Sequence, residues 1–104
     1  MPYDAAATGV TGFAFNITGA MVPTTLRFKV EDATGEYCTP SDKRVVAGAN
    51  SFVFADLRKE CWTTGGASGD MAKSALLKIA WQVVTTDAAT VPFDFCVSDI
   101  RALQ

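Results

Sequence analysis

The clearest alternation of hydrophobic and polar positions lies in residues 25–31, where every second side chain is apolar. The apolar positions are Leu26, Phe28 and Val30, and the polar positions are Arg27, Lys29 and Glu31. Successive side chains of a β-strand point to opposite faces of its sheet. The pattern therefore predicts a strand with one core face and one solvent face.

Residues 76–85 repeat this alternation with a different polar face. Strand parity gives one face to Leu77, Ile79, Trp81 and Val83, and the other to Lys78, Ala80 and Gln82. A small residue between an ammonium group and an amide predicts a shallow polar groove with Ala80 as its floor. The same parity favours a core position for Trp81 over sugar stacking, unless a β-bulge shifts the register.

Five further short strands are expected from apolar alternation and from the turn residues between them. They are residues 13–18, 36–39, 43–46, 51–56 and 91–100, with a compact turn at 57–62, a small-residue loop at 63–70 and a polar turn at 86–90. Seven short strands in 104 residues predict one domain, residues 1–104. The fold class expected is all-β, a jelly-roll β-sandwich of two antiparallel sheets.

In a jelly roll, strands that are distant in sequence alternate between two sheets. By this analogy one sheet holds residues 25–31, 36–39, 43–46 and 76–85, and the other holds 13–18, 51–56 and 91–100. The polar faces of 25–31 and 76–85 then form one surface. Arg27 and Lys29 are expected there beside Lys78, Ala80 and Gln82.

Composition narrows the range of functions. The hydrophobic fraction is 49% and the charged fraction 19%, which predicts a packed interior. The net charge is -2 and there is no Lys/Arg cluster, so we expect neither nucleic acid nor a membrane surface as partner. The chain has no histidine, the commonest general base, so we expect no enzyme. A glycosidase with two carboxylates is the remaining catalytic alternative, and surface solvation is favoured for its candidates, which are Glu31, Asp32, Glu36, Asp94 and Asp99.

Three cysteines, Cys38, Cys61 and Cys96, permit three different single disulfides with one thiol left over. None of them forms a Cys-x-x-Cys pair, so zinc or redox chemistry is not indicated. The favoured interpretation is one disulfide in an exported domain. No signal peptide or membrane-length apolar run is visible, so we expect the signal of an exported parent to lie outside this fragment.

A series of short segments in fixed order resembles the bacterial β-sandwich carbohydrate-binding modules attached to plant-cell-wall hydrolases, in particular carbohydrate-binding module family 81. The segments are Leu-Arg-Phe-Lys-Val, Gly-Glu-Tyr-Cys, Phe-Ala-Asp-Leu followed by Cys-Trp, Ile-Ala-Trp-Gln-Val, and Phe-Asp-Phe-Cys-Val-Ser-Asp-Ile. The resemblance implies a secreted, non-catalytic, monomeric module. It implies binding of soluble β-1,4-linked or mixed-linkage glucan, or xyloglucan, in a cleft on one sheet, and targeting of a covalently linked cellulase or hemicellulase.

A sugar chain is held by aromatic rings that stack on its apolar C–H faces and by forked polar groups that bind its hydroxyl pairs. Trp62 is the leading aromatic platform, because it follows Cys61 in a loop where no strand face demands its burial. The alternative that Trp62 plugs one end of the sandwich stays open. Tyr37 is the second candidate, although four residues do not determine its parity and a core position is equally expected.

The polar candidates for sugar binding are Gln82, Arg27, Lys29 and Lys78, and Trp81 is the less favoured aromatic one. For each polar residue the alternative is a solvated strand position. If the sheet carries no ligand, the protein is a structural or adhesive sandwich domain of a bacterial surface protein. That alternative predicts a buried Trp62.

A structural calcium ion is also expected from the resemblance, because Asp99 matches the place where related modules hold a calcium ligand. Asp4 joins it if the two ends of the chain lie side by side. The residue beside Asp99 is Ser98, where a second acidic residue is often found.

Overall fold

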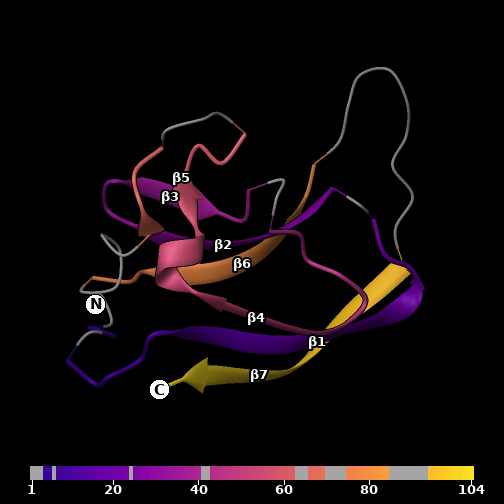
Figure 1. Ribbon diagram of the computed structural model, residues 1–104. Coiled ribbons are helices and arrows are strands. Elements are labelled where there is room, and N and C mark those ends of the chain that lie inside the picture. The colour runs from indigo at the N-terminus through magenta and orange to yellow at the C-terminus, as the bar shows by residue number, and fades with distance from the viewer. Residues whose placement is uncertain are drawn as a thin grey trace.

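The computed structural model describes residues 4, 5, 7–23, 25–40, 43–62, 66–69, 75–84 and 94–104. In this part of the chain two antiparallel sheets form two layers (Figure 1). The three-stranded sheet has the order β4 (Gly48–Val53), β1 (Gly12–Met21) and β7 (Asp94–Leu103). The four-stranded sheet has the order β5 (Arg58–Lys59), β3 (Gly35–Cys38), β2 (Leu26–Asp32) and β6 (Lys78–Val83). The all-β prediction is therefore confirmed.

The predicted division of strands between the two sheets is correct for six strands and wrong for the seventh. Residues 43–46 form no strand. The backbone N–H and C=O of Val46, the last of these residues, are hydrogen-bonded to the side-chain amide of Asn50 instead of to a neighbouring strand. Asn50 Oδ1 accepts a hydrogen bond from Val46 N–H at 2.9 Å, and Asn50 Nδ2 donates one to the Val46 carbonyl at 2.8 Å. The place beside β3 is taken by β5, through the pairs Tyr37↔Lys59 and Cys38↔Arg58.

Other boundaries also differ from the predicted ones. β1 extends to Met21 beyond the predicted residues 13–18, β6 is shorter than the predicted 76–85, and β7 continues to Leu103 beyond the predicted end at residue 100. The strand expected over residues 51–56 ends at Val53, and a 3-10 helix, η1 (Phe54–Asp56), follows it. The compact turn expected over residues 57–62 contains β5 before the chain turns at residues 60–62. Residues 63–65 and 70 of the predicted loop, the predicted turn at 86–90 and the predicted strand start at 91–93 lie outside the described residues.

The core lies between the two sheets and is centred on Phe28 of β2, which is fully buried. The Phe28 ring centroid lies 5.1 Å from that of Phe15 and 6.1 Å from those of Phe13 and Phe52, all on the opposite sheet. Aromatic pairs at such distances stabilise a core beyond their buried area, by about 0.5–1.5 kcal/mol each. This cluster holds the two layers together and fixes which face of β2 points outward.

Trp81 of β6 belongs to the same cluster. Its ring meets Phe15 edge-on at 5.1 Å and Phe28 at 5.4 Å, and the side chain is partly buried. The core position that parity favoured for Trp81 is therefore confirmed, because Trp81 lies opposite Phe28 in the β2–β6 register and points inward with it. Among the described residues, no helix has the length and apolar character needed to span a membrane.

Candidate binding face

The outer surface of the four-stranded sheet, here called the binding face, brings together the polar residues of β2 and β6. The two strands are antiparallel neighbours with the partners Arg27↔Gln82, Lys29↔Ala80 and Glu31↔Lys78. Leu26, Phe28 and Val30 alternate with the polar positions of β2 and are buried, so Arg27, Lys29 and Glu31 point away from the core. The predicted shared surface of these two strands is confirmed.

Trp62 borders this face with an exposed indole. Its relative solvent exposure is 63%, so it does not plug the end of the sandwich. The guanidinium carbon of Arg27 lies 5.7 Å from the centroid of the Trp62 ring, which is within the range of a cation–π contact. The contact sets the indole beside the row of Arg27 and Gln82.

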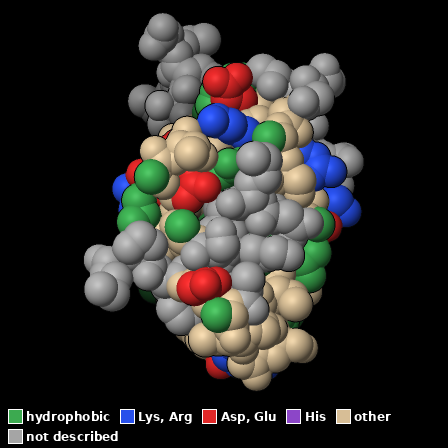
Figure 2. Space-filling model, turned by 90° about the vertical axis from the view of Figure 1, so that its left-hand side faces the viewer, with side chains coloured by type: hydrophobic (Ala, Val, Ile, Leu, Met, Phe, Trp, Pro, Cys, Tyr) green, Lys and Arg blue, Asp and Glu red, His purple; other side chains and the backbone are tan. Residues whose placement is uncertain are grey.

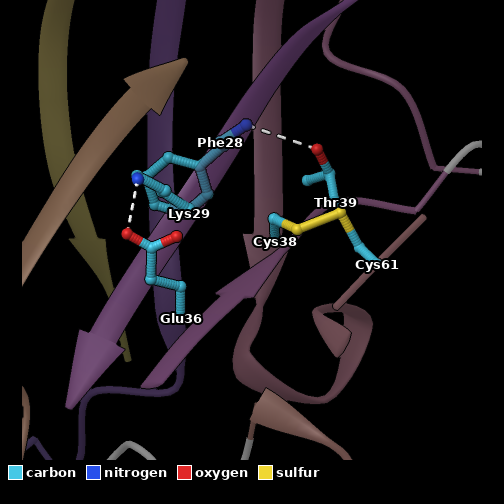
Figure 3. Close-up of a disulfide and its surroundings, with 6 residues drawn as sticks. All are labelled: Phe28, Lys29, Glu36, Cys38, Thr39 and Cys61. Atoms are coloured by element: carbon cyan, nitrogen blue, oxygen red, sulfur yellow. Dashed lines mark hydrogen bonds and ion pairs between the residues drawn. A yellow bond between two sulfur atoms is a disulfide. The ribbon is translucent and has the colours of Figure 1, made fainter. Parts of the chain in front are cut away.

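A disulfide between Cys38 and Cys61 holds the Trp62 segment on the sheet (Figure 3). Cys38 is the partner of Lys29 in the β2–β3 register, so the bridge is anchored beside the binding face. Cys61 directly precedes Trp62. Of the three pairings that the sequence permits, the structure contains this one, and Cys96 is a free, exposed cysteine.

Two ion pairs cross the binding face and neutralise its lysines. Lys29 Nζ lies 2.8 Å from Glu36 Oε1, and Lys78 Nζ lies 3.1 Å from Glu31 Oε2. The hydrogen bond from Lys29 is the main reason that the pKa of Glu36 is lowered, with the charges of Lys29 and Lys78 acting in the same direction against burial. Glu36 therefore stays ionised at neutral pH and keeps Lys29 in place (Figure 3).

Tyr37 does not belong to this face, which corrects its prediction as a sugar contact. It lies opposite Val30 in the β2–β3 register, points into the core and is only 1% exposed. Its hydroxyl lies 3.2 Å from Thr34 Oγ1 at the β2–β3 turn. The less favoured assignment of Trp81 as a sugar contact is also corrected, in agreement with its core position, because its ring packs on Phe15 and Phe28 and does not join Gln82 on the outer surface.

Asp32 organises the turn between β2 and β3. Its Oδ1 accepts hydrogen bonds from Thr34 N–H, Thr34 Oγ1–H and Gly35 N–H at 2.6–3.1 Å. Burial acts most strongly on the pKa of Asp32 and raises it, but these hydrogen bonds and the charge of Lys59 together outweigh burial, so the pKa is lowered. The carboxylate has a structural role in the turn, which leaves it unsuited to acid catalysis.

The two predicted calcium ligands have other roles in the structure. Asp4 Oδ1 accepts a hydrogen bond from Ala7 N–H at 3.0 Å, and Asp99 Oδ2 lies 3.5 Å from Arg101 Nε. Asp99 lies at a β-bulge within β7, where its φ of 53° is left-handed. In the part of the chain that the structure describes, no group of three or more His, Cys, Asp or Glu side chains could hold a metal ion. The calcium ion therefore stays a prediction.

Sequence reasoning did not assign Glu36 or Cys38 to the binding face. Both residues come from β3, which is four residues long, and their orientation depends on its pairing with β2. A four-residue strand carries too little alternation to reveal which of its faces is buried. The missing signal was the pairing of Cys38 with Cys61, which places this strand beside the segment that carries Trp62.

Comparisons with known proteins give no relative for this chain: it matches no protein family, no curated protein and no solved structure.

Proposed function

We propose that this protein is a non-catalytic carbohydrate-binding module that binds soluble β-glucan chains on the binding face. The observation that carries the proposal is the exposed indole of Trp62 beside the polar row of Arg27 and Gln82. An indole that is 63% exposed leaves apolar area on which a pyranose ring can stack. The adjacent guanidinium and amide supply donors and an acceptor for hydroxyl pairs.

The row formed by Trp62, Arg27 and Gln82 suits a sugar chain better than a single sugar. Trp62, Arg27 and Gln82 follow one another across the sheet, and Ala80 lies on the outer face of β6 two residues before Gln82. A small side chain at that position leaves room for a sugar ring to approach the sheet. Lys29 and Lys78, held by their carboxylate partners, border this space, and their ammonium groups can donate further hydrogen bonds to sugar hydroxyl oxygens.

The biological setting of the module is part of the same proposal. A jelly-roll strand order, secretion, action as a monomer and covalent linkage to a cellulase or hemicellulase follow from the resemblance to family 81 modules. The Cys38–Cys61 disulfide is compatible with an oxidising compartment. In this role the module raises the concentration of the linked catalytic domain at its polysaccharide.

The rival proposal, a structural or adhesive domain without a sugar ligand, requires a buried Trp62. The 63% exposure of the indole counts against this rival, because the rival predicts a buried Trp62.

Affinity electrophoresis in gels that contain barley β-glucan, hydroxyethyl cellulose or xyloglucan tests the proposal. The wild-type protein should be retarded in at least one gel, and Trp62→Ala should migrate as in a gel without polysaccharide. Met21→Ala serves as the matched control, because Met21 is an apolar residue on the three-stranded sheet that is 50% exposed. Equal mobility of the wild type in all gels would contradict the proposal.

A further inference from the structure

Arg27 differs from the other cations of the binding face in having neither an acidic partner nor a hydrogen-bond acceptor for its guanidinium among the described residues. Lys29 pairs with Glu36 and Lys78 with Glu31. Arg58 lies opposite Cys38 on β5, and its guanidinium donates hydrogen bonds to the carbonyls of Ala55 and Leu57. The guanidinium of Arg27 instead contacts the indole of Trp62. A cation–π contact uses the charge of a guanidinium and engages none of its N–H donors in a hydrogen bond to an oxygen acceptor. Arg27 therefore brings a full positive charge and unused donors to the surface.

The charge of the face also differs in sign from that of the whole protein. The outward positions of β2, β3 and β6 include the three cations Arg27, Lys29 and Lys78 and the two carboxylates Glu31 and Glu36. The formal net charge of the chain is -2. Figure 2 shows the side of the molecule turned 90° from Figure 1, where Lys and Arg side chains lie next to Asp and Glu side chains in the upper half. Arg58 of β5 adds a fourth cation, but its guanidinium donates to the carbonyls of Ala55 and Leu57. Among the described residues of the face, the positive charge that is left without a carboxylate or carbonyl partner is therefore that of Arg27.

We propose that the binding face prefers β-glycans that carry hexuronic acid units, and that Arg27 binds their carboxylate. This inference rests on the proposed function, since it names the ligand class of the same site. A neutral glucan needs only hydroxyl partners, which Gln82 and the paired lysines supply. A free guanidinium adds a charge-assisted, forked partner that matches a carboxylate in geometry as well as in charge.

The position of Arg27 allows one sugar chain to stack a ring on Trp62 and to place a carboxylate at the guanidinium. Trp62 lies on one side of Arg27, and Gln82 lies directly opposite Arg27 on the neighbouring strand. Side chains opposite each other in an antiparallel pair are close enough to share one ligand group. A chain whose ring stacks on Trp62 thus presents its C6 carboxylate, on that unit or the next, to the guanidinium, while the amide of Gln82 binds a hydroxyl.

The test uses two ligands that differ only in the carboxylate: cellohexaose and cellohexaose with its primary alcohols oxidised to carboxylates. Isothermal titration at low ionic strength should give about fivefold tighter binding of the oxidised chain by the wild type. Arg27→Gln should bind the two chains equally. Arg101→Gln is the matched control, because Arg101 is a 62% exposed arginine on the three-stranded sheet, and it should keep the preference. The preference should shrink as salt is added, because exposed charges are screened.

The outcomes separate this inference from the proposed function. Equal binding of both chains by the wild type overturns the inference alone. Binding of the oxidised chain without binding of cellohexaose overturns the neutral-glucan function and supports the inference. Binding of poly-glutamate as tight as that of the oxidised chain shows recognition of charge without sugar and overturns the inference. Failure to bind either sugar overturns both.

Discussion

The guanidinium carbon of Arg27 lies 5.7 Å from the centroid of the Trp62 ring, although the two residues come from segments 35 positions apart in the sequence. Arg27 is fixed by the β2–β6 ladder, and Trp62 is fixed by the disulfide of its neighbour Cys61. The contact therefore joins a rigid sheet to an aromatic side chain in a turn. This arrangement gives the indole a defined place at the edge of a polar strip while it stays exposed.

Loss of the disulfide should weaken both the fold and the binding face. In the Cys38→Ser, Cys61→Ser double variant the free energy of unfolding should fall by about 3 kcal/mol, because the 23-residue separation no longer restricts the unfolded chain. Sugar affinity should fall as well, since Trp62 is no longer held beside Arg27. Urea unfolding and titration with cellohexaose measure the two effects. Cys96→Ser should change neither, and a similar loss in this control would contradict the assigned pairing.

Trp81 should contribute to stability without contributing to sugar binding. Trp81→Ala removes the ring that packs on Phe15 and Phe28, at a cost of about 3 kcal/mol in urea unfolding. Trp81→Phe keeps an aromatic ring and should cost about 1 kcal/mol. Both variants should bind glucan like the wild type at a temperature where they are folded. Loss of affinity in the stable Trp81→Phe variant would instead make Trp81 a ligand contact.

Asp32 should make stability depend on acid pH. Its pKa is lowered in the folded protein, so its contribution is complete above the ordinary pKa of an aspartate and is lost as pH falls through the lowered value. The free energy of unfolding should therefore decrease below about pH 4, near the ordinary aspartate pKa. Asp32→Asn should show a shallower decrease over the same range. If the free energy of unfolding of this variant depended on pH as that of the wild type does, the pKa of Asp32 would not change on folding.

Asp99 should tolerate replacement by residues that accept a left-handed backbone. Asp99→Asn and Asp99→Gly should keep the wild-type melting temperature, whereas Asp99→Val should lose about 1–2 kcal/mol, because β-branched residues are strained at a φ of 53°. Addition of EDTA or calcium to the wild type distinguishes this backbone role from metal binding. A melting temperature that falls with EDTA and recovers with calcium, and a loss of that response in Asp99→Asn, would favour the calcium site.

Long alternating segments allowed correct predictions from the sequence, because strand parity assigns a whole face at once. The six strand residues from Lys78 to Val83 separated Lys78, Ala80 and Gln82 from Trp81, and the partner strand around Phe28 was equally clear. The expected neighbour relation of these two strands then located the polar face.

The remaining errors and open choices came from features that depend on tertiary contacts. Residues 43–46 end in two β-branched valines, as strands often do, but the side chain of Asn50 binds the backbone N–H and C=O of Val46. β5 is two residues long and carries no readable pattern. The bulge at Asp99 is a local change in register that no alternation reveals, and the choice among three disulfides was decided only by the pairing of β3.

An NMR titration of the uniformly labelled protein with cellohexaose locates the bound sugar residue by residue and so shows whether the glucan lies on the binding face. The two indole N–H signals, of Trp62 and Trp81, provide an internal comparison. A glucan bound at Trp62 should cause large chemical-shift changes for the Trp62 indole and for Arg27 and Gln82, with little change at the Trp81 indole and across β4, β1 and β7. Changes confined to the three-stranded sheet, or an unchanged spectrum at millimolar sugar, would contradict glucan binding on the binding face.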